Sequence, residues 1–356
     1  MRAAVIRAGV AAAVAVPAAA AAQCSGSESG RSAADFKQWA AAAFGDRIEF
    51  LLTLRCGAPL LGRAADPELA ALGDSVFAWL RSVGGECNAS IAVALFGSDP
   101  TSGGGLRGYA ATTDISAGDL VVSVPLDGGA VTVECALRDA EIGPQLCAMA
   151  AAALADDAPL TGAVLGDALP LACLAVFLCH HARRGDASPW APVIASLPHA
   201  HDALFAWSEE ERAELDGTDL EGAGERDCSF VHALWANVIA PSFHHGRDAN
   251  SRALSFHDFT NMYGVLLGRY FGAPAEVELS EPAPATSSGA ADGAEAKHDA
   301  LLAKMRRSAA VWPLIAPVAD LLNHGVGEFI SFTVTFCANP ANNLTCSSSC
   351  ISIHLK

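Results

Sequence analysis

The sequence is poor in basic and in aromatic side chains. Its 356 residues include 22 Lys and Arg against 39 Asp and Glu, a net charge of −17, and aromatic residues make up only 7%. Nucleic-acid binding depends on clustered basic side chains that neutralise phosphates, so this balance argues against a nucleic-acid partner and favours a basic protein or peptide. Hydrophobic residues make up 52%, which is enough for a sizeable core and excludes disorder throughout.

Two further features are missing. Beyond the N-terminus no stretch of eighteen or more apolar residues occurs, so we expect no stable membrane span. None of the 11 cysteines forms a C-x-x-C pair, which argues against a zinc ribbon and a thioredoxin-type pair. Cys337, Cys346 and Cys350 lie close together, but a zinc site there would need a fourth ligand. We predict ordinary thiols and no metal.

The first residues resemble a targeting peptide. Arg2 and Arg7 precede an apolar run that ends at Ala18–Ala22, which predicts a signal over residues 1–22 for the secretory route or, through it, for a plastid. The alternative is an alanine-rich leader without this role, in which case we expect a cytoplasmic protein. We expect residues 23–73 to form a linker and a helical region.

Helix and strand signals alternate in the first part of the chain. Asp66-Pro67 is typical of a helix start, and Leu69, Leu72, Val76 and Leu80 follow at helical spacing until Gly84-Gly85. The apolar, β-branched runs 91–95 and 120–124 predict strands. Between them lies a glycine-rich run, 103–108. Because a strand and not a helix is expected after it, a dinucleotide site or a P-loop is excluded.

The middle of the chain is predicted to be helical. Leu169–His181 is apolar nearly all round and predicts a buried helix that ends before Gly185. Ser208-Glu209-Glu210-Glu211 forms a capping box, and Ser255 with Asp258 begins a helix that carries Phe259, Met262, Leu266 and Tyr270. Residues 272–300 contain little apolar material and predict a disordered loop, after which order returns at Val311. These elements favour an α+β fold with a helical block inserted into a strand-rich unit.

One short segment near the C-terminus carries concentrated polar chemistry. In Asp320-Leu321-Leu322-Asn323-His324 an amide and an imidazole supply hydrogen-bond donors and acceptors beside a glycine. Taken alone, the end of a helix with exposed Asn and His is the simpler interpretation of this segment.

Several segments taken in order resemble SET-domain protein methyltransferases of the Rubisco large-subunit methyltransferase type. They are 77–85, 105–125, Ser188-Pro189-Trp190 with Leu197-Pro198 and Trp207–Glu210, Gly268-Arg269-Tyr270-Phe271, and the P-x-x-D-L-L-N-H segment Pro317–His324. Order and approximate spacing agree over residues 74–324. The resemblance implies a SET domain over 74–338, with a helical insert at about 167–271 and the loop at about 272–300. Residues 339–356 remain an unassigned tail, and the domain is expected to be incomplete at its C-terminus.

The resemblance also implies S-adenosylmethionine as cofactor and a set of site residues. Asn323 and His324 would contact the cofactor, and Leu106, Arg107 and Gly108 would present backbone groups to it. Arg269 would lie near its amino-acid part, where a guanidinium suits a carboxylate. Asp320 would border the pocket between cofactor and substrate. The substrate would be a protein with an exposed lysine, with histidine as a possible acceptor, and the enzyme a monomer.

The sequence departs from this family in its tyrosines. Lysine methylation needs a neutral amine, aimed at the methyl group, and such sites orient it with a tyrosine that follows the Asn-His segment. Here all three tyrosines, Tyr109, Tyr263 and Tyr270, precede His324. Two interpretations stay open. The chain is a protein-lysine methyltransferase whose sequence is truncated or misjoined and which is weakly active or inactive as written, or it is a noncatalytic protein-binding module derived from the SET domain.

Overall fold

The computed structural model describes residues 63–64, 67–96, 106–155, 158–160, 165–198, 201, 203–243, 254–274, 292–319, 332–337 and 350–355. The chain divides into two compact units. The larger unit comprises Ala65–Val93, Ala111–Leu322 and Phe332–Lys356, and the smaller one comprises Met1–Ala64, Ala94–Ala110 and Asn323–Ser331.

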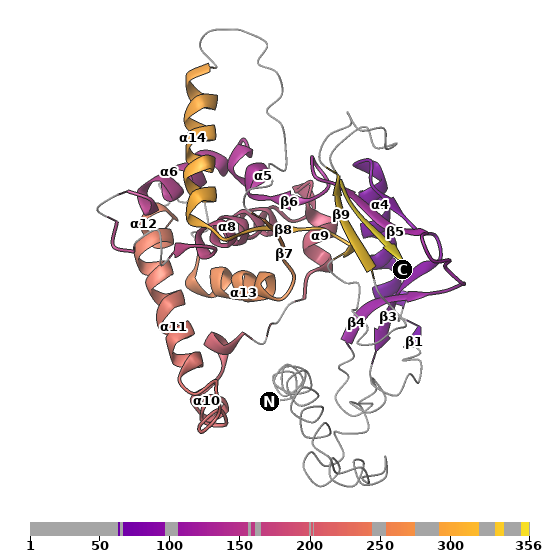
Figure 1. Ribbon diagram of the computed structural model, residues 1–356, viewed down its shortest axis with the longest axis horizontal. Coiled ribbons are helices and arrows are strands. Elements are labelled where there is room, and N and C mark those ends of the chain that lie inside the picture. The colour runs from indigo at the N-terminus through magenta and orange to yellow at the C-terminus, as the bar shows by residue number, and fades with distance from the viewer. Residues whose placement is uncertain are drawn as a thin grey trace, which may run out of the picture. The chain divides into compact units, whose positions relative to one another are not determined.

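Figure 1 labels the helices and strands. The helices are α4 (Pro67–Ser82), α5 (Val133–Arg138), α6 (Gly143–Ala153), α8 (Ala168–Arg184), α9 (Ala191–Ser196), α10 (Glu209–Ala213), α11 (Ala223–Leu234), α12 (Ala240–Phe243), α13 (Phe256–Leu267) and α14 (Asp292–Ser308), with short turns η2 (Gly185–Ala187) and η3 (Leu204–Ala206) and a π-helical segment η4 (Trp235–Ile239). The strands are β1 (Arg63–Ala64), β2 (Glu86–Cys87), β3 (Ile91–Phe96), β4 (Leu106–Ala111), β5 (Leu120–Pro125), β6 (Val131–Thr132), β7 (Phe271–Pro274), β8 (Val311–Ile315), β9 (Phe332–Cys337) and β10 (Cys350–Leu355). The predicted α+β class is confirmed.

Helix α8 forms the centre of the larger unit. Its residues from Leu169 to Cys179 are all buried, because the sequence there is apolar around the whole helix. It contacts α5, α6, α9, α13 and β8, and Figure 1 shows it surrounded by the other helices. Basic side chains in the last turn and Gly185, with φ 54°, end it, as predicted from the sequence.

A four-stranded antiparallel sheet in the order β2-β5-β10-β9 also lies in the larger unit. Its strand β10 pairs Ile351 with Val124 of β5 and with Phe336 of β9. Ile351 and Ile353 are buried. Part of the 339–356 segment, which stayed unassigned from the sequence, therefore forms an inner strand of this sheet. The short Ile-Ser-Ile run becomes a strand through its neighbours on both sides.

A small sheet in the order β6-β8-β7 connects parts of the chain that lie far apart in sequence. Antiparallel pairing places Phe271 opposite Leu314 and Pro274 opposite Val311. The start of β8 is held by Asp167, whose Oδ1 accepts hydrogen bonds from the backbone N–H groups of Ala310 (2.7 Å) and Val311 (2.9 Å). Because Phe271 begins β7 and its partner Leu314 is near the end of β8, the start of β7 and the end of β8 lie at the same end of this sheet.

Most predicted helix boundaries are confirmed. Ser208 and Glu211 form the capping box, and the Ser255 side chain accepts from the backbone N–H of Asp258 at the start of α13. Tyr270 is not on that helix, because the chain leaves it at Gly268.

The structure differs from the predicted disorder at both ends of 272–300. Strand β7 reaches Pro274, and α14 begins at Asp292. Residues 275–291 lie outside the described part. Pairing with β8 and packing of α14 on α6 stabilise ends whose own sequences are weakly apolar.

In the smaller unit, β1 pairs with β3 through Arg63 opposite Leu95 and Ala64 opposite Ala94. The sheet order is β1-β3-β4. In neither unit does any described helix have the length and apolar character needed to cross a membrane. The predicted targeting peptide, residues 1–22, lies outside the described residues.

Candidate functional site

The glycine-rich run leads into a strand, as predicted. Leu106, Arg107 and Gly108 are the first residues of β4, in the smaller unit. Gly108 is buried. Glycine has no side chain to keep another group away from its backbone, and the predicted contact of these residues with a cofactor stays a prediction.

Arg269 lies in the turn that joins α13 to β7, in the larger unit. Its backbone N–H donates to the carbonyl of Leu266 (2.9 Å), and the residue is half-buried. Because Phe271 pairs with Leu314, Arg269 lies at the end of the sheet where β8 leaves toward Ala319. That residue is the last one described before the Asp320–His324 segment.

The remaining predicted site residues, Asp320, Asn323 and His324, lie outside the described residues. Leu106–Gly108 belong to the smaller unit and Arg269 to the larger one. Convergence of these three segments on one pocket therefore stays a prediction.

The backbone is strained immediately before that segment. Val318 has φ 73° and is 1% exposed. A β-branched residue in the left-handed region is a true outlier, and such strain clusters at functional sites when the surrounding structure maintains it. The strained turn lies two residues from Asp320.

Strand β8 is also held by a buried ionic group whose residues come from α5 and α14. Glu134 Oε1 accepts hydrogen bonds from Arg306 (2.5 Å) and from the indole Nε1 of Trp312 (3.0 Å), and the Arg306 guanidinium lies 5.2 Å from the centre of the Trp312 ring. Glu134 Oε2 and Arg306 Nε are buried and have no hydrogen-bond partner among the described residues. This group ties α5 and α14 to the strand that leads to the predicted site.

A second polar group has the composition of a hydrolase triad but not its accessibility. Ser188 Oγ lies 3.0 Å from His181 Nδ1, and His181 Nε2 lies 3.3 Å from Asp139 Oδ2. Ser188 is 5% and His181 1% exposed, and Ser188 Oγ also accepts from the backbone of Trp190 (3.1 Å). A nucleophile needs access to a substrate carbon, so we interpret this group as structural. Within the described ranges, no three His, Cys, Asp or Glu side chains are placed to hold a metal ion.

Helix α13 lines a smaller and a larger cavity. The smaller, of about 90 Å³, lies between α8, α13 and β8, and Tyr263 and Tyr270, the residue after Arg269, line it. The larger, of about 380 Å³, lies among η3, α11 and α13. Small-molecule sites usually have about 300–1,000 Å³, so only the larger of the two has the volume of a binding pocket.

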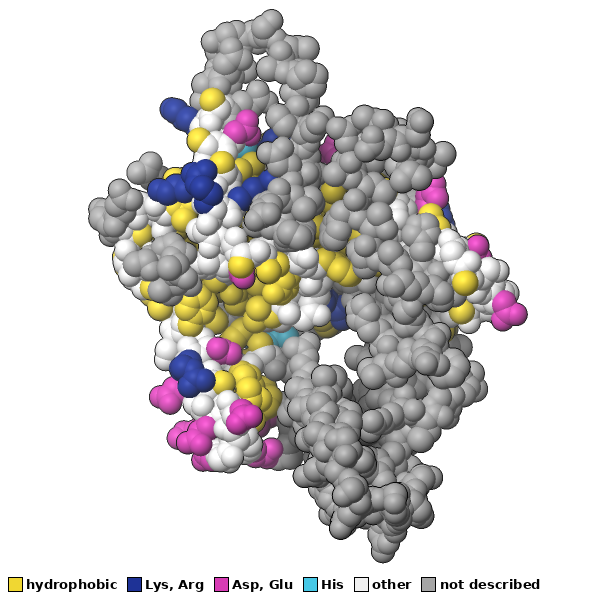
Figure 2. Space-filling view, in the orientation of Figure 1, with side chains coloured by type: hydrophobic (Ala, Val, Ile, Leu, Met, Phe, Trp, Pro, Cys, Tyr) yellow, Lys and Arg dark blue, Asp and Glu magenta, His cyan; other side chains and the backbone are white. Residues whose placement is uncertain are grey.

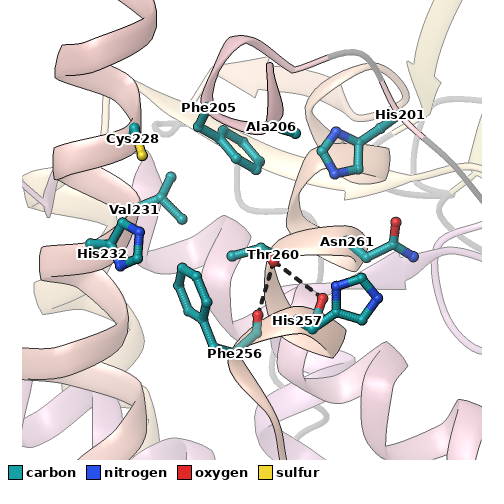
Figure 3. A pocket seen from close by; sticks show the side chains of 10 residues that line it. All are labelled: His201, Phe205, Ala206, Cys228, Val231, His232, Phe256, His257, Thr260 and Asn261. Carbon is teal, nitrogen blue, oxygen red and sulfur yellow. Dashed lines mark hydrogen bonds between the residues drawn. The ribbon is translucent and has the colours of Figure 1, made fainter. Parts of the chain in front are cut away.

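The larger cavity, which we call the insert pocket, is lined by rings on opposite sides (Figure 3). On one side His201 and Phe205 are 5.2 Å apart between ring centres, and on the other His232 stacks on Phe256 at 4.5 Å. Further lining comes from Ala206, Cys228, Val231, His257, Thr260 and Asn261. This pocket was not predicted from the sequence. The pairs Cys228/His232 and Phe256/Thr260 at i, i+4 could have indicated two facing helix surfaces.

Some polar atoms that line the insert pocket already have hydrogen-bond partners within the protein. Thr260 Oγ1 lies 2.9 Å from the carbonyl oxygen of Phe256 and 3.1 Å from that of His257, as Figure 3 shows. His201 Nδ1 accepts from the backbone N–H of Ala203 (3.2 Å), so the neutral ring carries its proton on Nε2. What remains for a ligand is mainly the faces of aromatic rings.

Comparisons with known proteins agree with the resemblance found in the sequence. The chain is 25% identical over 289 residues to N-lysine methyltransferase SETD6 of Mus musculus, which covers 77% of this chain and 50% of that protein. The resemblance to protein-lysine methyltransferases is confirmed. A chloroplastic fructose-bisphosphate aldolase-lysine N-methyltransferase of Arabidopsis thaliana is 28% identical over 110 residues, 31% of this chain and 23% of that protein. The chain thus spans half the length, or less, of these methyltransferase relatives.

No protein-family model matches the chain. Among solved structures, Rubisco LSMT bound to sinefungin and monomethyllysine aligns with a TM-score of 0.46 and 20% identity, covering 81% of this chain and 49% of that one. Rubisco LSMT bound to AdoMet aligns with a TM-score of 0.44 at 20% identity and covers 73% of this chain and 47% of that one.

Proposed function

We propose that this chain is an S-adenosylmethionine-dependent protein-lysine N-methyltransferase of the SET type. The observation that carries the proposal is the similarity to an N-lysine methyltransferase along 77% of the chain. The proposed SET domain spans 74–338, with the helical insert at about 167–271. Its substrate is a protein with an exposed lysine, histidine being the alternative acceptor, and the enzyme acts as a monomer.

The proposed site residues have side chains suited to this cofactor. S-adenosylmethionine supplies an electrophilic methyl group on a sulfonium, and its amino-acid part carries a carboxylate. Arg269 offers a guanidinium for that carboxylate, and Leu106, Arg107 and Gly108 would present backbone groups to the cofactor, with no side chain at Gly108 to obstruct it. Asn323 and His324 would hold the nucleoside and the methionine part, and Asp320 would border the channel. The sheet register, which brings Arg269 to the end where β8 leaves toward Asp320, supports this grouping.

The amine must reach the site uncharged. A free lysine has a pKa of about 10.4, so the enzyme has to desolvate the ammonium group and aim the lone pair of the neutral amine in line with the methyl group. Alignment and exclusion of water are therefore the main tasks of the protein. No strong acid is required.

The alternative function is a noncatalytic binding module. The observation that favours it is that all three tyrosines precede His324. Tyr109 and Tyr263 are buried at 8% and 4% exposure, whereas Tyr270 is 36% exposed beside the smaller cavity.

A methyl-transfer assay separates the two. Radiolabelled S-adenosylmethionine and a lysine-rich protein extract are incubated with the 356-residue chain and, where the sequenced transcript continues, with the longer product. We expect labelled protein from the longer product and little from the 356 residues, since losing one aligning group costs about a hundredfold. Label from neither, together with retained binding of a basic protein, would favour the noncatalytic module.

The location is a separate proposal. The predicted leader over residues 1–22 and the chloroplastic relative from Arabidopsis thaliana favour a plastid, with the secretory route and the cytoplasm as alternatives. A fluorescent fusion carrying residues 1–22 tests this directly. Diffuse cytoplasmic signal would contradict it.

A further inference from the structure

Strongly acidic stretches of chain adjoin the elements that form the insert pocket. Eight exposed carboxylates lie on α10, on α11 and between them, and they are Glu209, Glu210, Glu214, Asp216, Asp219, Glu221, Glu225 and Asp227. Between residues 203 and 232 the only Lys or Arg residues are Arg212 and Arg226. Figure 2 shows acidic side chains gathered over α10. This surface is continuous in sequence with the pocket, because Phe205 and Ala206 precede α10 and α11 forms one wall.

Asp227 connects the acidic surface to the pocket wall. It lies one turn of α11 before Val231, which lines the pocket. Its carboxylate also acts on the Tyr263 hydroxyl of α13, whose pKa is raised first by burial, then by Tyr270 and Asp227. Partial desolvation raises the pKa of Asp227 itself, against the opposing effect of Arg226, so a cationic partner would stabilise its charged form.

Aromatic faces and carboxylates together suit one kind of side chain. A cation over the face of an aromatic ring is attracted by the ring quadrupole, and arginine adds stacking of its planar guanidinium. The insert pocket offers Phe205 and Phe256 on its two sides. Glu225 and Asp227, which we call the acidic rim, lie on α11 about one turn before the lining residues Cys228 and Val231. A neutral aromatic ligand would stack on the rings but would not be attracted by the carboxylates. A divalent cation would be attracted by the carboxylates but would not stack on the rings.

We propose that the insert pocket is a docking site for an arginine or lysine side chain in a basic segment of the protein substrate. This rests on the proposed function, in that the docked protein is the one to be methylated. The pocket lies in the helical insert and holds a residue other than the acceptor lysine. Docking would raise the local concentration of the acceptor without contributing to the transfer itself.

The test measures docking without methyl transfer. A short fluorescent peptide of alternating Arg and Gly is titrated with the full chain by anisotropy, beside the same peptide with every Arg replaced by citrulline, which keeps the shape and removes the charge. We expect binding of the arginine peptide that weakens with added salt, and at least about tenfold weaker binding of the citrulline peptide.

Variants locate the binding. Ala206→Arg places a cation of the chain itself at the exposed edge of the insert pocket, and Glu225→Gln with Asp227→Asn removes two rim charges. Each should weaken peptide binding by about five- to tenfold. The control, Glu68→Gln with Asp74→Asn, removes two exposed charges from α4 and should change binding less than about twofold. Thermal unfolding establishes that all variants are folded.

Three results would overturn the docking site. They are equal binding of both peptides, equal loss in the α4 control, or no binding of the arginine peptide. Because neither cofactor nor methyl transfer enters this measurement, the docking site can fail while the methyl-transfer assay succeeds, and the reverse can occur.

Discussion

The imidazole of His201 packs directly on the backbone of Gly264 in α13. A Cβ added at Gly264 would lie only 2.5 Å from Cγ of His201, well inside contact distance. Glycine in a helix interior costs roughly 1 kcal/mol relative to alanine, so its place in α13 has a packing reason. The absent side chain lets the ring form one side of the insert pocket.

Gly264→Ala should therefore destabilise the protein although alanine favours helices. Overpacking a well-packed position costs about 1–3 kcal/mol, which outweighs the gain in helix propensity. Urea unfolding measures the change. Gln145→Ala, on the exposed face of α6, serves as the control and should leave stability within about 0.5 kcal/mol. A stabilised Gly264→Ala protein would show that His201 moves away freely.

Glu134→Ala should be among the most damaging single changes. It leaves Arg306 and the Trp312 indole without their shared acceptor in a buried place, and breaking a buried pair in this way costs about 3–5 kcal/mol. The control is the exposed pair Arg138–Asp299, at 3.9 Å, where Arg138→Ala should cost less than about 1 kcal/mol. Equal losses of unfolding free energy would contradict the role given to the buried group.

Stability should fall as the pH drops below the ordinary histidine pKa. Burial lowers the pKa of His181 despite the attraction of Asp139, so the unfolded chain takes up this proton more readily than the folded one. His181 therefore contributes fully to the free energy of unfolding above its ordinary pKa of 6.5. This contribution is lost as the pH falls from that value toward the lowered pKa of the folded protein.

Asp139 adds to this at lower pH. Its pKa is lowered because hydrogen bonds from the backbone of Ile142 and Glu141, and the neighbouring His181, outweigh the effect of burial. Measuring the free energy of unfolding with denaturant between about pH 7.5 and about pH 5.5 tests the contribution of His181. His181→Gln should flatten the slope in this window, and an unchanged slope would assign the pH dependence to other groups.

At the strained turn of Val318 we expect glycine and alanine variants to differ in stability in the opposite order from the usual one. At an ordinary buried position glycine is less stable than alanine, but at φ 73° alanine keeps the strain and glycine relieves it. We expect Val318→Gly to be as stable as Val318→Ala or more stable, by up to about 1 kcal/mol. At Val122, buried within β5, the order should be the reverse. The same order at both positions would mean that the turn carries no strain.

Local sequence patterns predicted well those helices and strands whose formation depends mainly on their own residues. The capping box at Ser208 and the apolar run of α8 are examples, because a cap or a continuous apolar surface is sufficient to define a helix. β10 could not be predicted in the same way, since Ile351 and Ile353 become a strand through pairing with β5 and β9. The insert pocket was missed for a related reason. His201 precedes η3, His232 lies in α11 and Phe256 in α13, and only packing brings their rings together.

The candidate cofactor site was predicted from a resemblance of motifs in order. It stays a prediction, and the structure adds only that the pairing of Phe271 with Leu314 brings Arg269 to the end of β8. Nothing in the local pattern of Gly268–Phe271 predicts that long-range pairing.

Calorimetric titration of the full chain with S-adenosylmethionine, beside Arg269→Gln, tests whether the protein has a methyltransferase cofactor site at Arg269. We expect one molecule bound per chain, and binding about tenfold or more weaker in the variant, because a charged hydrogen bond to the carboxylate contributes roughly 1.5–3 kcal/mol. Thermal unfolding without cofactor should be nearly the same for both proteins. If a folded wild-type chain releases no heat on titration, or if both bind equally, the assignment of a methyltransferase cofactor site at Arg269 is contradicted.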